Sequence, residues 1–159
     1  MKTPIVQSAQ GITLAGGAPF TGRDLTYCLT RAPVAVAADS GADRLLRHGV
    51  MPEAVIGDFD SILAESRARI PAIRQHVVAE QATTDFDKAL RSISAPIVLA
   101  LGFAGARLDH GLAAMSTLVA RANLPCILIG PKDVAFAAPP RLELDLVVGE
   151  PFSLFPMAP

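Results

Sequence analysis

The chain has 159 residues, of which 51% are hydrophobic and 18% charged, and its formal net charge is -1. A chain of this length and composition can bury a sizeable core, which excludes a disordered protein and makes one folded unit the starting expectation. The 14 Lys and Arg residues are matched by 15 Asp and Glu residues, and this balance argues against the basic surface typical of nucleic-acid binding.

The cysteines, the apolar stretches and the N-terminal residues indicate the cellular compartment in which the protein is expected. Cys28 and Cys126 are far apart in apolar surroundings, which is typical of core residues in a reducing compartment. The longest apolar stretch, residues 96–106, is interrupted by two glycines and is too short to span a membrane. Residues 1–10 lack the apolar block of a secretory signal. We therefore expect a cytoplasmic protein with neither a membrane nor a nucleic acid as partner.

Short apolar runs alternate with helix-like segments along the first 130 residues, as in parallel α/β sheets. The runs predict strands at residues 12–15, 34–38, 54–56, 76–79, 97–101 and 126–129. Apolar residues at three- and four-residue spacing predict helices at residues 24–29, 42–48, 62–70, 85–93 and 112–122. Gly49 is expected to end the second helix, and Ser61 and Thr84 to cap the third and fourth. The predicted fold class is α/β, an open, mostly parallel sheet with flanking helices.

The pattern changes after Gly130. In residues 141–148 (RLELDLVV) leucines alternate with charged residues, which predicts a half-exposed antiparallel strand. The last eight residues, 152–159, are mostly apolar. We therefore expect an α/β domain at residues 1–130, followed at residues 131–159 by the opening strands of a truncated antiparallel β-sandwich domain. The apolar segment 147–155 is expected to pair with another chain or with the rest of that domain.

Charged residues follow several predicted strands at their carboxyl ends. In an open parallel sheet these ends share one edge, and ligands bind at that edge. Asp85 opens the helix predicted at residues 85–93, and Lys88 follows three residues later on the same helix face. The residues placed at this edge are Asp39, Asp58, Asp60, Asp85, Lys88, Arg107, Asp109 and His110.

Carboxylates gathered at one edge repel one another unless a cation neutralises them. Oxygen ligands without His or Cys partners favour Mg²⁺, which commonly joins carboxylates to substrate phosphates. Lys88 and Arg107 would add the positive charge that a polyphosphate still requires. The pattern indicates phosphoryl transfer without a P-loop, because the sequence lacks GxxxxGK[ST].

Each of these elements also has a simpler interpretation: an Asp-x-Asp such as Asp58 and Asp60 often occurs by chance, and His110 could simply start a helix. Asp39 could cap the helix that follows it, and Asp85 would be stabilised by the dipole of its own helix. Arg107 and Asp109 could form a surface ion pair. The coincidence of four acidic turns at one edge favours a functional site over these separate explanations.

Four segments of the sequence resemble the thiamine pyrophosphokinase (thiamin diphosphokinase) family, in the family's order and spacing. They are AADSGADRLL at residues 37–46, PEAVIGDFDSI at 52–62, EQATTDFDKAL at 80–90 and GFAGARLDHGLA at 102–113. The resemblance implies an ATP-binding α/β domain, a thiamine-binding β-sandwich domain and a homodimer with active sites between subunits. It also implies Mg²⁺-dependent transfer of diphosphate from ATP to the hydroxyethyl group of thiamine, giving thiamine diphosphate and AMP.

The resemblance also implies roles for individual residues. Asp58, Asp60 and Asp85 match positions that hold Mg²⁺, and together with Lys88 they form the expected catalytic set. The expected substrate and ATP contacts are Asp39, Gln81, Thr84, Lys88, Arg107 and Asp109. Two features depart from the family pattern: Ser40 stands where the family often has Gly, and family members continue well past the position of residues 153–156.

Two other interpretations stay open. A non-catalytic module that binds nucleotide and Mg²⁺, or that dimerises, would fit a chain lacking the acceptor domain. A nucleotide-sugar transferase would use Asp58 and Asp60 as a metal-binding Asp-x-Asp, and a phosphatase would use Asp58 as its nucleophile. Neither enzyme explains why the same edge also carries Asp85, Lys88, Arg107 and Asp109.

Overall fold

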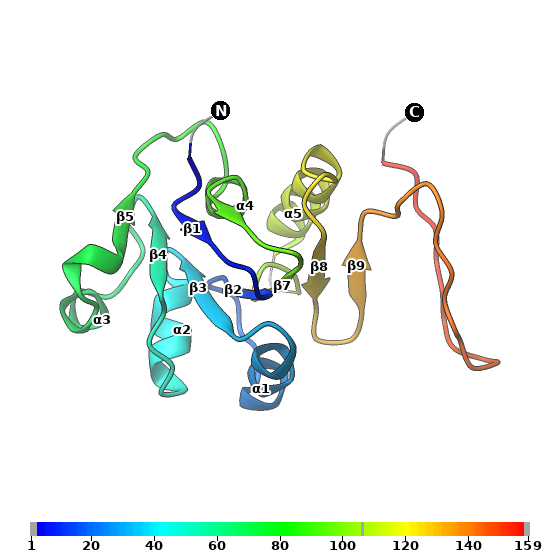
Figure 1. Ribbon diagram of the computed structural model, residues 1–159, viewed down its shortest axis with the longest axis horizontal. Coiled ribbons are helices and arrows are strands. Elements are labelled where there is room, and N and C mark those ends of the chain that lie inside the picture. The colour runs from blue at the N-terminus through cyan, green and yellow to red at the C-terminus, as the bar shows by residue number, and fades with distance from the viewer. Residues whose placement is uncertain (1–2, 106, 158–159) are drawn as a thin grey trace.

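The computed structural model describes residues 3–105 and 107–157. The main strands are β2 (Ile12–Ala15), β3 (Val34–Ala38), β4 (Ala54–Gly57), β5 (Gln75–Val77), β7 (Val98–Leu101), β8 (Cys126–Ile129) and β9 (Val134–Phe136). They form one sheet in the order β5-β4-β3-β2-β7-β8-β9, in which only β9 is antiparallel to its neighbour (Figure 1). Two short strands, β1 (Val6–Gln7) and β6 (Ile93–Ser94), pair separately.

Helices cover both faces of this sheet (Figure 1). They are α1 (Gly22–Arg31), α2 (Gly41–Arg47), α3 (Ala64–Arg69), α4 (Asp85–Leu90) and α5 (Leu108–Ala120), with a 3-10 turn at Ala72–Arg74. Leu14 and Val36 pack in one core with α4 and α5. Ala15 and Ala37 pack in the other with α1 and α2. Because successive strand residues point to opposite faces and helices cover both, β2 is buried along its whole length and β3 along nearly all of its length. Both strands are apolar except for Thr13, whose hydroxyl donates to the backbone carbonyl of Ala32.

The predicted α/β fold is confirmed. The structure reproduces the bounds of three predicted strands, β2, β3 and β8, and contains all five predicted helices. Helix α4 is N-capped by Thr84 as predicted, and Gly49 follows α2 with φ of +75°. The short β1 and β6 were not predicted, because two-residue strands carry no periodic pattern.

The cap predicted for the third helix is wrong. Helix α3 begins later, with Leu63 as its N-cap residue, and the backbone N–H of Leu63 donates to the carboxylate of Asp43 at 3.3 Å. The hydroxyl of Ser61 instead donates to Asp39. Ser61 therefore belongs to the edge of the sheet rather than to the helix.

The strand order reverses beside β2, the first strand of the main sheet. From there the chain adds β3, β4 and β5 on one side and then β7 and β8 on the other. In open α/β sheets a crevice forms at such a reversal, outside the carboxyl ends of the strands. The residues after β2, β3, β4 and β7 therefore surround one location.

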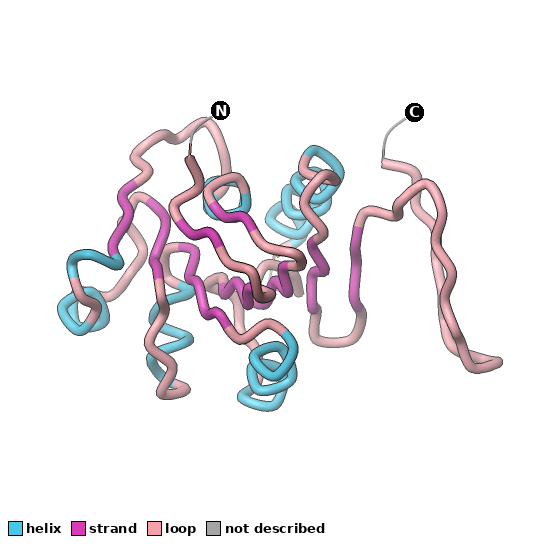
Figure 2. The backbone as a smooth tube through the Cα atoms, in the orientation of Figure 1, coloured by secondary structure: helices cyan, strands magenta, loops and turns pink. Residues whose placement is uncertain are grey.

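The tail follows β9. Strand β9 extends the main sheet to Phe136, past the predicted boundary at residue 130, and the division into two domains stays a prediction. Residues 137–157 contain no helix or strand, so the strand predicted at 141–148 is wrong. They form an arm that turns near Gly149 and runs back beside itself (Figure 2). Leu142, Leu144 and Leu146 are exposed on this arm, and an isolated pair of extended segments buries too little to form a stable hairpin.

Two general features complete the fold. Cys28 and Cys126 are buried core residues, as predicted, and neither forms a disulfide. Among the described residues, no helix combines the length and the apolar character that a membrane crossing requires.

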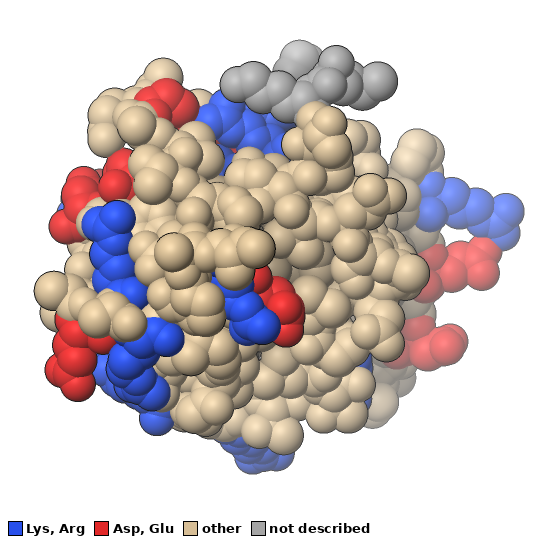
Figure 3. Space-filling view, turned by 60° about the vertical axis from the view of Figure 1, so that its left-hand side comes forward, with Lys and Arg blue, Asp and Glu red and all other residues tan. Residues whose placement is uncertain are grey.

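Figure 3 shows basic and acidic side chains interspersed on one face of the molecule.

Candidate active site

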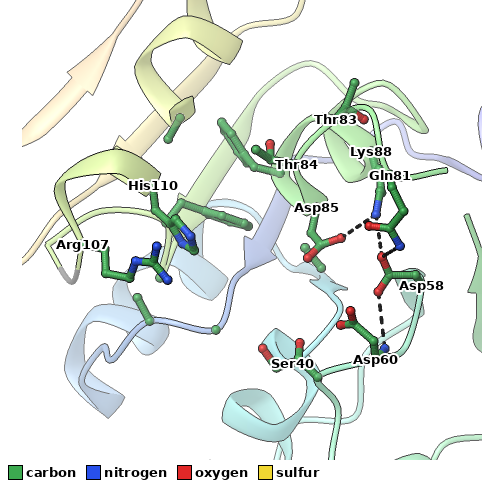
Figure 4. Close-up of a pocket in the computed structure, with 18 of the residues that line it drawn as sticks. Ser40, Asp58, Asp60, Gln81, Thr83, Thr84, Asp85, Lys88, Arg107 and His110 are labelled. Carbon is green, nitrogen blue, oxygen red and sulfur yellow. Dashed lines mark hydrogen bonds and ion pairs between the residues drawn. The ribbon is translucent and has the colours of Figure 1, made fainter. Parts of the chain in front are cut away.

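A cavity of about 570 Å³ opens at the carboxyl ends of the strands (Figure 4). Its walls come from the turns after β2, β3, β4 and β7, from the loop before α4, and from the start of α4 and α5. The lining residues central to its chemistry are Ser40, Asp58, Asp60, Ser61, Gln81, Thr83, Thr84, Asp85, Lys88, Arg107 and His110. The structure thus brings seven of the predicted site residues to the cavity surface: Asp58, Asp60, Gln81, Thr84, Asp85, Lys88 and Arg107.

Asp39 lies behind this surface, at the end of β3. It is 1% exposed, and its backbone has a left-handed φ of 43°. One carboxylate oxygen accepts from Ser61, and the other, Oδ1, is buried with no hydrogen-bond partner among the described residues. Burial raises the pKa of this carboxyl, as do the nearby charges of Asp85, Asp58 and Asp60. A buried carboxylate oxygen without a donor is costly, and a cation would satisfy it.

Asp58 and Asp60 are held beside Asp39 by the turn after β4. Between them Phe59 takes a left-handed φ of 64°, with its ring in the core. A Cβ on Gly57 would lie 2.9 Å from the Cβ of Asp39, so glycine permits the close approach of the two turns. Asp39, Asp58 and Asp60 each offer a carboxylate oxygen, and these oxygens lie within 4.8 Å of one another. This arrangement could hold a hard divalent cation.

Lys88 supplies positive charge to the carboxylates from α4. Its ammonium lies 2.8 Å from Asp58 and 3.1 Å from Asp85, which confirms that Asp85 and Lys88 share a helix face. Burial alone would lower the pKa of Lys88, but its bonds to the two carboxylates outweigh burial and raise that pKa. The hydrogen bond from Lys88 is the main reason that the pKa of Asp58 falls to about 2. Asp58 is therefore ionised at neutral pH.

The loop between β5 and α4 brings Gln81 and Thr84 to the cavity. The side-chain amide of Gln81 donates to Asp58 at 3.0 Å. The hydroxyl oxygen of Thr84 accepts from the backbone N–H of Asp87 at 3.2 Å. Asp85, the third metal ligand expected from the sequence, lies outside the cluster formed by Asp39 and its two neighbours.

Arg107 and His110 lie across the cavity from Asp58 and Asp85 (Figure 4). Arg107 forms a bidentate pair with Asp109, with the shorter contact at 2.6 Å. Their hydrogen bonds raise the pKa of Arg107 and lower that of Asp109. Both side chains are exposed, and Arg107 lines the cavity whereas Asp109 does not. The two residues thus form a surface ion pair whose guanidinium lies at the cavity wall.

Three further residues of the cavity had no role in the site assigned from the sequence. Ser61 was interpreted as a helix cap, His110 as a residue of the same edge without a function, and Thr83 was not considered. The position of Ser61 directly after Asp60 was the signal that could have identified it. Thr83 carried no local signal, because its place depends on how the loop folds.

Charge at the cavity is unbalanced. Among the described residues, four carboxylates, those of Asp39, Asp58, Asp60 and Asp85, face two cations, and one of these cations is already paired with Asp109. A polyphosphate would meet net negative charge there. Entry of such an anion therefore requires an additional cation at the carboxylates.

The comparisons with known proteins agree with one another. A family model described as thiamin pyrophosphokinase, catalytic domain, matches residues 25–128. A thiamine pyrophosphokinase of Bacillus subtilis (strain 168) is 35% identical over 106 residues, which are 62% of this chain and 49% of that protein. The chain thus spans about half the length of this curated relative.

Solved structures show the same relationship. Thiamine pyrophosphokinase from Bacillus subtilis matches with a TM-score of 0.61 and 28% identity, over 76% of this chain and 60% of that one. Thiamin pyrophosphokinase from Geobacillus thermodenitrificans matches with a TM-score of 0.60 and 27% identity, over 74% of this chain and 58% of that one.

Proposed function

The chain belongs to the thiamin pyrophosphokinase catalytic-domain family, and from this premise we propose that it is the ATP-binding part of a thiamine diphosphokinase. In the proposed reaction the hydroxyethyl oxygen of thiamine attacks the β-phosphorus of ATP. The bond from this phosphorus to the oxygen bridging it to the α-phosphate breaks, and the products are thiamine diphosphate and AMP. Such a transfer depends on in-line positioning and charge stabilisation rather than on a covalent intermediate.

The observation that carries the proposal is the carboxylate cluster with its unpartnered oxygen. Asp39 presents a buried Oδ1 that no described donor satisfies, next to Asp58 and Asp60. An all-oxygen set of this kind fits Mg²⁺. When bound, Mg²⁺ would neutralise the carboxylates and stabilise charge on the phosphate oxygens.

The remaining roles follow from the charges and hydrogen-bond donors at the cavity. Lys88 and Gln81, both bonded to Asp58, would hold phosphate oxygens as charged and neutral donors. Arg107 would contact the nucleotide from the opposite wall, with Asp109 orienting its guanidinium. Thr84 would act mainly by fixing the start of α4.

Asp39 and Asp85 compete for the role of third metal ligand. The oxygens of Asp39 lie within the cluster, whereas Asp85 bonds to Lys88. We propose Asp39 as the ligand and Asp85 as the residue that orients Lys88. Mg²⁺ titrations of Asp39→Asn and Asp85→Asn separate the roles: the first should lose metal affinity, and the second should retain it.

The thiamine side of the proposal concerns residues 131–159. We propose that they open the second, thiamine-binding domain and that the protein is a homodimer and cytoplasmic. Support for an added domain comes from the arm, where Leu144, Val148 and Leu154 are exposed. A sharply monomeric species at high concentration in sedimentation experiments would contradict the dimer.

The test of the proposed function is turnover. The chain is incubated with ATP, Mg²⁺ and thiamine, and AMP and thiamine diphosphate are quantified by chromatography. Formation of both products in equal amounts supports the diphosphokinase. Mg²⁺-dependent nucleotide binding without products supports the alternative, a nucleotide-binding module that lacks its acceptor domain.

A further inference from the structure

The loop at residues 80–84 builds one wall of the cavity with few anchors of its own. Gln81, Thr83 and Thr84 all line the cavity. Before the loop, the backbone N–H of Val78 bonds to Gly57, and at its end Thr84 caps α4. Between these two points, something else must fix the conformation that directs Gln81 toward Asp58.

Glu80 makes the bonds that fold this loop. One of its carboxylate oxygens accepts from the backbone N–H of Ala82 at 2.8 Å. The other accepts from the hydroxyl of Thr83 and from the guanidinium of Arg91. Glu80 itself does not line the cavity. Its carboxylate therefore acts on the loop from behind the wall.

Arg91 connects Glu80 to a partly exposed ion-pair network between two helices, which is centred on the buried carboxylate of Asp87. Its guanidinium lies 3.8 Å from Asp87 of α4, which is only 8% exposed. Asp87 in turn accepts two hydrogen bonds from Arg121, at the end of α5, at 2.9 and 3.3 Å. Bidentate pairing of this kind fixes geometry as well as charge. The loop is thus tied through Asp87 to the helix that carries Lys88.

We propose that Glu80 is a positioning residue for the nucleotide site. Glu80 folds the loop at residues 80–84 so that Gln81 bonds to Asp58 and Thr83 lies at the cavity wall. The ion pairs that link Arg91, Asp87 and Arg121 anchor Glu80 to α4 and α5. The positioning itself concerns the unliganded protein. Its effect on nucleotide affinity rests on the proposed function.

The first test needs no ligand. The side-chain amide signal of Gln81 is followed by ¹⁵N NMR in Glu80→Ala. The reference variant is Asp58→Asn, which removes the charge of the carboxylate that accepts the hydrogen bond from Gln81. Glu80→Ala should shift this signal in the same direction as the reference and speed amide exchange across residues 78–84. A signal that stays at its original position would overturn the proposal, whether or not the protein binds nucleotide.

The second test measures binding of a non-hydrolysable ATP analogue with Mg²⁺ by calorimetry. Glu80→Ala removes the carboxylate that accepts the charge-assisted hydrogen bonds of the loop. Its affinity for the ATP analogue should therefore fall about tenfold. Glu143→Ala is the matched control, because Glu143 also pairs with an arginine, Arg141, but lies on the exposed arm. It should leave the affinity unchanged.

A double variant separates positioning from general destabilisation. If Glu80 acts through Gln81, Glu80→Ala should weaken binding much less in a Gln81→Ala background than in the original protein. Equal losses in the two backgrounds would contradict that route. Absence of nucleotide binding by the unmodified protein would contradict the proposed function, while the NMR result would still decide whether Glu80 positions the loop.

Discussion

On one side of the cavity Lys88 is 2% exposed between Asp58 and Asp85, and on the other Arg107 and Asp109 are 67% and 61% exposed. Both sides pair a cation with carboxylates at hydrogen-bond distance. Burial makes the difference, because a buried charge depends on its partner whereas water replaces the partner of an exposed one. The first pair should therefore matter for folding and function, and the second for function alone.

The largest effect is expected for Lys88→Met, which preserves volume and removes the charge. Asp58 would remain in a largely enclosed position without its main partner, and loss of one member of a buried pair costs about 3 kcal/mol of unfolding free energy. Urea denaturation at neutral pH measures this loss. A variant as stable as the original protein would show that the pair is effectively solvated.

Asp58→Asn should lower the free energy of unfolding by about 2 kcal/mol at neutral pH, which is the usual contribution of a hydrogen bond between charged groups. The pKa of Asp58 in the folded protein is about 2, below its ordinary value of 3.8. Its ionised form therefore stabilises the fold fully above its ordinary pKa, and this contribution is lost as the pH falls toward the lowered one. Unfolding at pH 6, 4 and 3 should show the difference between variant and original protein shrinking. A constant difference would contradict the assigned pKa.

Asp39→Asn should change stability in the opposite direction. The pKa of Asp39 is raised because its carboxylate is buried, so removal of the charge should stabilise the metal-free protein by about 1 kcal/mol. The same change should abolish the stabilisation that added Mg²⁺ gives. Thermal unfolding with and without Mg²⁺ measures both effects, and a destabilised variant that keeps its response to Mg²⁺ would contradict the role of Asp39.

The smallest effect on stability is expected for Arg107→Ala. An exposed pair contributes little, so the unfolding free energy should change by less than about 0.5 kcal/mol. Binding of an ATP analogue should nevertheless weaken, because the guanidinium faces the cavity. If Arg107→Ala instead lowered the unfolding free energy and left the affinity for the ATP analogue unchanged, the exposed pair would serve folding rather than binding, contrary to this prediction.

The position of the carboxylates was predictable from the sequence for a local reason. Short apolar runs identify β3 and β4, and the residues after parallel strands share an edge whatever the details of packing. Asp58 and Asp60 could thus be assigned to one location before any contact was known. The contact of Asp85 with Lys88 followed in the same way from helical spacing.

Other contacts depend on packing that the sequence does not display. Ser61 bonds to Asp39 across 22 positions, and Arg121 bonds to Asp87 across 34. No periodic pattern connects such pairs, so the cap assigned to Ser61 was wrong. The strand predicted at residues 141–148 was wrong for a related reason, since alternation describes a strand that has a partner, and no strand forms in the described part of the arm, residues 137–157.

The carboxylate side of the cavity should admit a polyphosphate only together with a divalent cation. Calorimetric titration of the chain with a non-hydrolysable ATP analogue, with and without Mg²⁺ and followed by thiamine, tests it most directly. We expect binding with Mg²⁺, little binding without it, and loss of binding in Asp58→Asn. Equal affinity with and without Mg²⁺, or no binding under either condition, would contradict it.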